Sequence, residues 1–352
     1  MTAVRLELHD RIEPIAHAWD ELVDRAAAAP FARPGWFRAW WSAFGSGRLQ
    51  IVALHRGREL AAVLPLERRA GLLRSLTNWH TPELEVPALD AGARERLLRD
   101  LIGRARIPVS LGMLTGGRQE PQVVKAVAAD AGMRLLARTI ERSPYVRLDG
   151  DWDGYAQALP RRRRSELRRR ERRLGEQGEL GFEVRDGGER LDALLAEGFA
   201  VEPSGWKAEA GTAIASRPET TAFYTQVARW AAERGELRLA FLRLGGRPLA
   251  FHFTIEDGRS AYQLKGGYDP GYKAYSPGTL LIGRMLEWAF GLRLRSYEFL
   301  GEDEGFKADW TSDTRDRLTV QAFPRSLSGS AAFAAFNYGR PLAKRARDLV
   351  LR

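Results

Sequence analysis

The sequence predicts an α/β fold of two tandem domains, each a mixed, mostly antiparallel sheet flanked by helices. Three observations lead to this prediction. A length of 352 residues is enough for two domains of ordinary size. Stretches with a helical period of apolar residues alternate with short strand-like runs, which indicates a mixed α/β class. The same order of elements also occurs twice along the chain.

The composition fits a folded protein without disulfides. Hydrophobic residues make up 44% of the chain and charged residues 28%, so we expect a sizeable core. The chain has no cysteine, which excludes disulfides, thiolate metal sites and a cysteine nucleophile. No apolar run reaches the roughly 18 residues that span a bilayer, and the N-terminus lacks the apolar region of a signal peptide. We therefore expect no transmembrane segment and a cytoplasmic location, with peripheral contact at the inner membrane surface left open.

The elements of the first half follow from the spacing of its apolar residues. Residues 13–29 and 34–44 have the period of amphipathic helices. Residues 49–55 and 60–66 are strand-like and flank a turn that contains Gly57, which predicts a hairpin. The remaining expected elements are an irregular stretch at 79–89, helices at 91–105 and 121–131, and a strand at 107–114.

The second half repeats this order. Residues 237–244 and 249–255 flank a Gly-Gly-Arg-Pro turn and predict a second hairpin. The pentapeptide Gly57–Ala61 aligns with Gly246–Ala250, so we interpret the halves as an internal duplication. A chance match between two common Gly-Arg turns is the alternative. The other expected elements are helices at 191–199, 218–234 and 277–290, and strands at 260–268 and 294–300.

A segment rich in proline and glycine, residues 138–165, is predicted to link the halves. We expect a first domain at 1–150, a second domain at 151–325 that holds the active site, and a helical tail at 326–352.

Positive charge concentrates at the start of the second domain. The chain carries 55 basic and 45 acidic residues, a net charge of +10, and residues 161–173 alone contain nine Arg and two Glu. This segment predicts a strongly basic helix. Its charge would be balanced by an anionic ligand, which could be a phosphate, a nucleotide sugar, an anionic glycan or lipid headgroups. We name Arg164 and Arg168 as candidate substrate-binding residues on it. A solvated basic face is the alternative.

The tetrapeptide Ser276–Thr279 is the strongest helix-start signal of the second half. Ser276 is expected to cap the helix, and Pro277 suits its first position. Gly278 would leave the first-turn N–H groups uncrowded, and a helix N-terminus with free N–H groups attracts anions. An ordinary helix start without a ligand is the alternative.

Several motifs of the second half resemble the GNAT superfamily acyltransferases of the cellulose-biosynthesis acetyltransferase type. The resemblance covers roughly residues 161–310, and one difference is Glu298, where such families more often place Asp. The arrangement also resembles the Fem-type aminoacyltransferases, which are built from tandem GNAT domains. The first half matches only in its order of elements and in an aromatic pattern between residues 31 and 41. The motifs are Trp206-Lys207, Gly211-Thr212, Lys265-Gly-Gly-Tyr-Asp269, Tyr275-Ser-Pro-Gly278, Tyr297-Glu-Phe-Leu-Gly-Glu-Asp303, Lys307 and Trp310.

The resemblance implies two GNAT-like domains and an N-acyltransferase that uses acyl-CoA as co-substrate. The acceptor would be an amine of a small molecule, an amino sugar or a polysaccharide precursor, and an O-acyl acceptor stays open. The pyrophosphate would lie at the helix that starts near Ser276, and a splay between strands 260–268 and 294–300 would admit the pantetheine arm. The implied carrier-binding residues are Tyr275, Ser276, Pro277, Gly278, Thr279 and Leu280.

Acyl transfer to an amine needs a base for the amine proton, a donor for the oxyanion and an acid for the leaving thiolate. Glu302 or Asp303 could be the base, Lys265 an oxyanion donor, and Tyr297 a proton donor. A solvated acidic turn and a structural salt bridge are the alternatives for the charged residues. Further candidate substrate-binding residues are Trp206, Lys207, Trp79, His80 and Lys307.

The five histidines show no metal-ligand spacing, so we expect no metal. His252 alternates with two phenylalanines and is read as a structural residue. Two other functions stay open for the chain. One is a Fem-type transferase that takes its aminoacyl group from tRNA, with the arginine-rich helix as an RNA contact. The other is a non-catalytic protein that binds an anionic glycan or phosphate.

Overall fold

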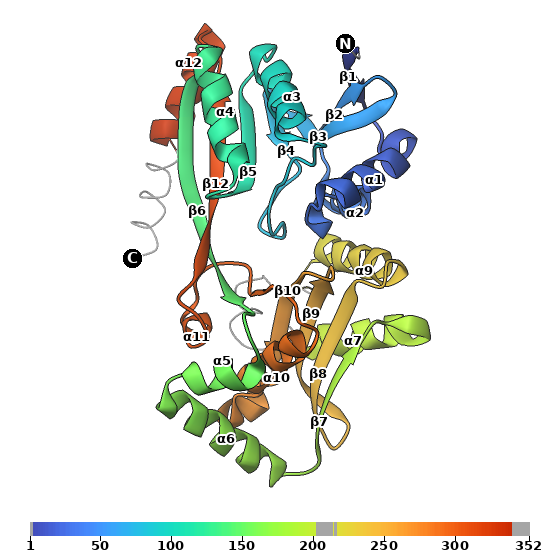
Figure 1. Cartoon of the computed structure of the whole chain (residues 1–352), viewed down its shortest axis with the longest axis vertical. Coiled ribbons are helices and arrows are strands. Elements are labelled where there is room, and N and C mark those ends of the chain that lie inside the picture. The colour runs from blue at the N-terminus through green and yellow to red at the C-terminus, as the bar shows by residue number, and fades with distance from the viewer. Residues whose placement is uncertain (1–2, 202–213, 215–216, 340–352) are drawn as a thin grey trace. The chain divides into compact units, whose positions relative to one another are not determined.

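The computed structural model describes residues 3–201, 214 and 217–339, and the chain divides into two compact units (Figure 1). Unit 1 comprises Met1–Glu141 and Asp316–Arg352, and unit 2 comprises Arg142–Arg315. Among the described residues, no helix has both the length and the apolar character that crossing a membrane requires.

Unit 1 has a mixed sheet with helices beside it. Within this unit the strand order is β1-β2-β3-β4-β5-β12-β6, and β4 runs parallel to β5. Strands β6 and β12 both extend past the boundary of the unit. The elements are β1 (Val4–His9), η1 (Glu13–Ile15), α1 (Ala16–Ala26), η2 (Pro30–Ala32), α2 (Pro34–Phe44), β2 (Arg48–Arg56), β3 (Glu59–Arg69), β4 (Leu72–Ser75), α3 (Ala91–Gly103), β5 (Val109–Thr115), α4 (Gln119–Asp130), β6 (Arg134–Arg147), β12 (Thr314–Phe323), α12 (Leu327–Ala334) and η6 (Ala335–Gly339).

The core of unit 1 forms around β3. Residues 60–67 of this strand are all buried, which means that both of its faces are covered. Helices α1 and α3 both contact it. Trp19 is fully buried, and its indole N–H donates to the carbonyl of Ala32 at 2.8 Å. Phe31, Trp36 and Trp40 of the aromatic pattern are buried as well, so this pattern marks core positions.

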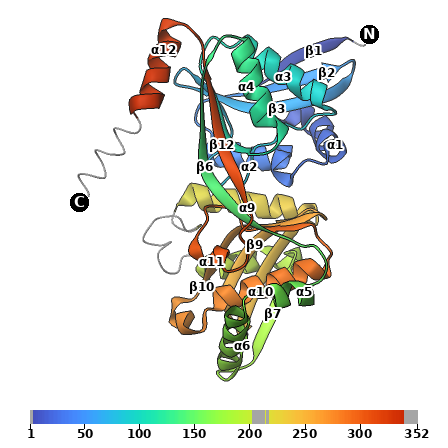
Figure 2. The same cartoon turned by 60° about the vertical axis from the view of Figure 1, so that its left-hand side comes forward.

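Unit 2 has a second mixed sheet, with strand order β6-β11-β10-β9-β8-β7 (Figure 2). Its strand pairs are antiparallel except for β10 and β11. Its elements after β6 are α5 (Trp152–Ala158), α6 (Arg161–Gly175), β7 (Leu180–Arg185), η3 (Gly188–Arg190), α7 (Leu191–Val201), α9 (Pro218–Glu233), β8 (Leu237–Leu244), β9 (Arg247–Glu256), β10 (Ser260–Tyr268), η5 (Pro270–Tyr275), α10 (Pro277–Gly291), β11 (Ser296–Glu298) and α11 (Gly305–Ala308).

Helices cover both faces of the unit 2 sheet. Phe251 on β9 packs so closely on α7 that a Cβ at Gly198 would lie 2.4 Å from its ring. The adjacent Ala250 belongs instead to the cluster that Leu281 and Met285 of α10 complete. Because neighbouring strand residues point to opposite faces, α7 and α10 lie on opposite sides of the sheet.

Both units show the same order of elements, namely strand, two helices, three strands, helix and strand. In unit 1 this series runs from β1 to β5, and in unit 2 from β7 to β11. The predicted α/β fold of two tandem domains, each a mixed sheet flanked by helices, is confirmed, as are both hairpins and the helix over residues 161–173. Five strands, β1, β4, β6, β7 and β12, were not predicted. Most of the expected linker at 138–165 is regular structure, because β6 continues to Arg147, α5 covers Trp152–Ala158 and α6 begins at Arg161.

A buried ion pair lies inside unit 1. Arg317 on β12 is 1% exposed, and its Nη1 lies 2.9 Å from Oε2 of Glu83. The hydroxyl of Thr115 also donates to this carboxylate at 2.8 Å. Burial alone would raise the pKa of Glu83, but the charges of Arg317 and Arg118 and these hydrogen bonds lower it to about 2. The carboxylate is therefore ionised in the folded unit.

Replacing Arg317 with Met should lower the free energy of unfolding by about 3–5 kcal/mol, because Glu83 would remain buried without its partner. Because folding lowers the pKa of Glu83, its contribution is present above about pH 4.5 and is lost as the pH falls towards 2. Urea denaturation measures both effects. The control is Arg96→Met, which removes an exposed pair with Asp100 and should cost less than about 1 kcal/mol. Equal losses in the two variants would contradict this assignment.

Candidate active site

Strands β10 and β11 of unit 2 pair over a short distance and then diverge. Their parallel register contains three residue pairs and ends at Tyr262 and Glu298. Strand β10 then continues for six residues along β9, with a register shift between Gln263 and Lys265. The chain after β11 turns away instead, and the Phe299 N–H bonds the Pro144 carbonyl. The pairing of β10 and β11 therefore shows the expected splay between these strands.

A tight turn held by a buried ammonium ends β11. Leu300 and Gly301 have φ of 54° and 64°, the left-handed region that turns the chain sharply. Lys307 is 7% exposed, and its Nζ donates to the carbonyl oxygens of Leu300 at 2.7 Å and Glu302 at 2.8 Å. Lys307, a candidate substrate-binding residue, thus fastens the segment that carries Glu302 and Asp303.

Helix α10 begins directly after η5 with an open first turn. Pro277 is its first residue, as expected, but Ser276 does not cap the helix with its side chain. Ser276 adopts a left-handed conformation, and its hydroxyl bonds the Lys273 carbonyl at 3.4 Å. The Ser276 carbonyl accepts from the N–H groups of Thr279 and Leu280. The Gly278 N–H has no hydrogen-bond partner within the described part of the chain.

The position of Gly278 leaves little room for a side chain. A Cβ at this position would lie 3.2 Å from the ring of Tyr268, the last residue of β10. A bare main chain therefore fits here, and it leaves one amide at the positive end of the α10 dipole for an anion.

The equivalent helix start in unit 1, that of α3, is closed to an anion. Helix α3 is capped by the carboxylate of Asp90, which accepts from the Ala93 N–H at 2.8 Å and would repel an anion. The segment before it lies between β3 and β5, where the Leu84 N–H bonds the Met113 carbonyl at 2.7 Å and the Leu89 N–H bonds the Ala61 carbonyl at 2.9 Å. Only unit 2 thus combines a gap between strands with an uncapped helix start among the described residues.

A cavity of about 930 Å³ borders the first turn of α10 in unit 2. Thr279 contributes to its wall, together with the first half of α6 and residues 306–313. Arg163 is its most buried arginine, 8% exposed, with Nη1 3.1 Å from Asp309 and the guanidinium over the ring of Trp310. Burial lowers the pKa of Arg163, and the charge of Asp309 opposes this shift.

Three hydrogen-bond donors lie behind the wall of this cavity without a partner in the described structure. Nε and Nη2 of Arg163 and Nε1 of Trp310 are buried and have no hydrogen-bond partner among the described residues. Leaving buried donors unpaired costs about 1–3 kcal/mol each, more for charged groups. Rotation of the Arg163 guanidinium towards the cavity would let a ligand with several acceptor oxygens satisfy its donors.

Arg163 was not singled out from the sequence, although a signal was available. Arg163, Leu167 and Leu174 lie on the inward side of α6 at helical spacing, so position 163 belongs to the buried stripe. The predicted Arg164 and Arg168 line a separate cavity of about 230 Å³, beside α5 and α10.

Of the four expected catalytic residues, three follow the paired part of β10 and β11, whereas Tyr297 lies within it, opposite Ala261. Lys265, on β10, is half-buried with its Nζ 5.6 Å from the ring centroid of Tyr224. Glu302 and Asp303 are exposed in the segment after β11. Tyr297 is fully buried, and its hydroxyl donates to Gln263 at 3.0 Å. Burial raises the pKa of Tyr297, so this residue keeps its proton.

The side chains of Glu298 and His252 in unit 2 are buried and make structural contacts. Glu298 is buried, accepts from Ser296 at 2.8 Å and pairs with Arg315 at 3.1 Å. His252 is buried opposite Gly266, where a Cβ would lie 2.7 Å from the imidazole. The glycine is therefore required for the histidine to pack.

The other expected substrate-binding residues belong to unit 1 or lie outside the described residues. Trp79 and His80 belong to unit 1, where Trp79 is 56% exposed and His80 stacks on Phe44 at 5.2 Å. Trp206 and Lys207 lie outside the described residues.

A parallel strand pair that splays beside an uncapped helix start is the arrangement that the resemblance to GNAT acyltransferases implied. Residues 161–308 match the family model described as acetyltransferase (GNAT) domain. The chain thus contains a GNAT domain in unit 2 and is an acyltransferase enzyme of that type. No curated protein matches the chain in sequence.

Solved structures share the fold of nearly the whole chain. FemX aligns with a TM-score of 0.59 and 12% identity, over 89% of this chain and 96% of its own. L-PGS from Bacillus licheniformis gives 0.56 and 12%, over 88% and 93%. The C-terminal domain of a putative lysylphosphatidylglycerol synthetase from Agrobacterium fabrum gives 0.54 and 15%, over 90% and 96%. At these identities the similarity establishes the fold and not the substrate.

Replacing Lys307 with Met should loosen the turn after β11, because two carbonyls lose a charged donor worth about 1.5–3 kcal/mol each. We expect faster amide hydrogen exchange at residues 299–305 and a lower free energy of unfolding. Mass spectrometry of exchange measures the first effect. Lys273→Met, which changes an exposed lysine of the same unit, should leave these amides unchanged. Unaltered exchange in the Lys307 variant would show that the ammonium does not hold the turn.

Proposed function

We propose that unit 2 transfers an acyl group from acyl-CoA to an amine of a small molecule, an amino sugar or a polysaccharide precursor. The observation that carries the proposal is the divergence of β10 and β11 after three residue pairs, next to the free Gly278 amide of α10. The unpaired edge of β10 offers main-chain groups to the amides of a pantetheine arm.

The phosphates of the carrier would be held by the first turn of α10 and by Arg163. A diphosphate has enough acceptor oxygens for the Gly278 N–H and the unused donors behind the cavity wall. Because Thr279 is part of the cavity wall, one ligand could reach both the first turn of α10 and Arg163. Tyr275, Ser276, Pro277 and Leu280 would shape this turn and need no charge of their own.

Chemistry would take place where the strands part. Glu302 or Asp303 takes a proton from the amine, whose nitrogen then attacks the thioester carbonyl carbon. Lys265 stabilises the oxyanion that develops. The C–S bond breaks, CoA leaves as a thiolate that takes up a proton, and the amide product keeps the new C–N bond. Tyr297 acts by positioning, because its hydroxyl is bonded to Gln263.

Transfer of an aminoacyl group from tRNA is a second candidate function, favoured by the exposed arginines of α6. These side chains lie outside the two cavities or at their rims and could contact a phosphate backbone. FemX and the lysylphosphatidylglycerol synthetase domain share this fold. A mobility-shift titration with bulk tRNA at low salt separates the two functions. The exposed arginines are Arg161, Arg162, Arg168, Arg169, Arg172 and Arg173.

Calorimetry with acetyl-CoA and longer acyl-CoA should detect binding, and Arg163→Met should weaken it by about 10- to 100-fold, since a charge-assisted hydrogen bond is lost. Arg169→Met is the matched control, because Arg169 is exposed on the same helix and lines neither cavity. Thermal unfolding of both variants separates lost binding from lost folding. Absence of binding by the unaltered protein to every acyl-CoA would refute the proposed carrier.

Turnover assays that follow thiol release from acyl-CoA, with a panel of amino sugars and amino acids, test the catalytic residues. Lys265→Met and either Glu302→Gln or Asp303→Asn should lower kcat by about 100-fold or more, the usual contribution of general base or oxyanion catalysis. Lys125→Met, an exposed lysine of unit 1, should have no effect. Full turnover in all three site variants would remove these residues from the chemistry.

A further inference from the structure

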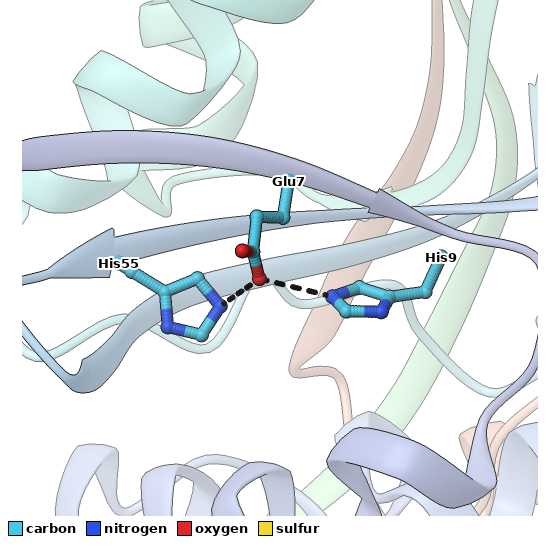
Figure 3. A group of neighbouring side chains, drawn as sticks. All are labelled: Glu7, His9 and His55. Atoms are coloured by element: carbon cyan, nitrogen blue, oxygen red, sulfur yellow. Dashed lines mark ion pairs between the residues drawn. The ribbon is translucent and has the colours of Figure 1, made fainter.

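Three side chains with metal-binding chemistry meet on the β1–β2 ribbon of unit 1, apart from the proposed active site. Strand β1 pairs with β2 in antiparallel register, with Arg5 opposite His55 and Glu7 opposite Ala53. Opposed residues and every second residue share a face, so Glu7, His9 and His55 project from the same side. Figure 3 shows the two imidazoles on either side of the Glu7 carboxylate.

The distances fit a small metal ion. Nε2 of His55 lies 3.2 Å from Oε2 of Glu7, and Nε2 of His9 lies 3.6 Å from the same oxygen. All three potential ligand atoms lie within 4.8 Å of one another. Around a tetrahedral zinc ion with bonds of about 2.0–2.1 Å, neighbouring ligand atoms are about 3.3 Å apart. A small adjustment of His9 would complete such a set.

Nε2 of each ring forms an ion pair with the Glu7 carboxylate when the ring is protonated, and it makes no hydrogen bond within the described residues. Nε2 of His9 and Nε2 of His55 are buried and have no hydrogen-bond partner in the described part of the chain. Their side chains are 21% and 12% exposed. A buried imidazole nitrogen without a partner is unfavourable, and a metal ion would satisfy both. No hydrogen bond joins either ring to the carboxylate in its place.

The carboxylate is oriented by a neighbour. Oε1 of Glu7 forms an ion pair with Nη2 of Arg5 at 2.8 Å, so Oε2 is the atom turned towards the histidines. Contacts of this kind, made by the atom of a ligand that does not bind the metal, commonly orient ligands in metal sites.

We propose that Glu7, His9 and His55 bind one zinc ion or a similar transition-metal ion, with water in the fourth position. Two imidazoles and one carboxylate suit such ions, whereas Mg²⁺ and Ca²⁺ prefer oxygen ligands throughout. The ion would join β1, the terminal strand of the unit 1 sheet, to its neighbour β2. This site takes no part in acyl transfer.

Zinc titration of the metal-stripped protein, prepared without a polyhistidine tag and followed by calorimetry, tests the proposal. We expect one ion per chain, and a loss of affinity of more than about 100-fold in His9→Ala and in His55→Ala, since even outer partners of ligands contribute about 10- to 100-fold. Glu7→Gln preserves the shape of its side chain and should weaken binding as well. Mg²⁺ should not bind in the same range.

The matched control is His17→Ala. His17 lies 3.6 Å from Glu21 on α1 but has no second histidine beside it, so its loss should leave the zinc affinity unchanged. Zinc should also raise the Tm of the unaltered protein and not that of the His9 variant. The proposal is overturned if the unaltered protein binds no zinc, or if His17→Ala weakens binding as much as His9→Ala and His55→Ala do.

Discussion

The buried ammonium of Lys307 is the interaction on which the arrangement of unit 2 depends. By donating to the carbonyls of Leu300 and Glu302, it holds two left-handed residues in succession. Such a turn costs conformational energy at Leu300, which has a side chain, and the hydrogen bonds offset that cost. Because the chain turns here, β11 leaves β10 after three residue pairs. The gap, the position of Glu302 and Asp303, and the wall of the larger cavity all follow from this turn.

The two units show how one fold can keep or lose a ligand site through local changes. Both have a parallel strand pair joined by a helix. In unit 1 a carboxylate caps that helix and Leu84 occupies the space beside β5. In unit 2 the helix start is bare and its neighbours are arginines. The difference therefore lies in which sign of charge faces the first turn of the helix and in what fills the space between the strands.

Elements with a strong local signal could be predicted from the sequence. The hairpins were found because alternating apolar residues flank Gly57 and Gly246, and α10 was found because Pro277 suits a first turn. Strands β6 and β12 were missed because their sequences mix charged and apolar residues, and because their partners are distant in sequence. The cluster of Glu7, His9 and His55 was missed because its members are also distant in sequence. His55 is 46 residues from His9, and only the pairing of β1 with β2 brings them together. Arg163 was hidden in a run of nine similar residues, where only its place on the buried stripe distinguishes it.

The path of the chain through unit 1 limits how this protein can be divided. Strand β5 has β12 as a neighbour, and β12 is supplied by residues that come after the whole of unit 2. A fragment that stops near residue 150 would expose the edge of β5 and remove Arg317 from the buried Glu83. Joining the segment that begins at Asp316 directly to Glu141 would restore the β12 neighbour of β5 and the partner of Glu83. Unit 1 can therefore be studied alone as a fusion of its two segments, and not as a simple truncation.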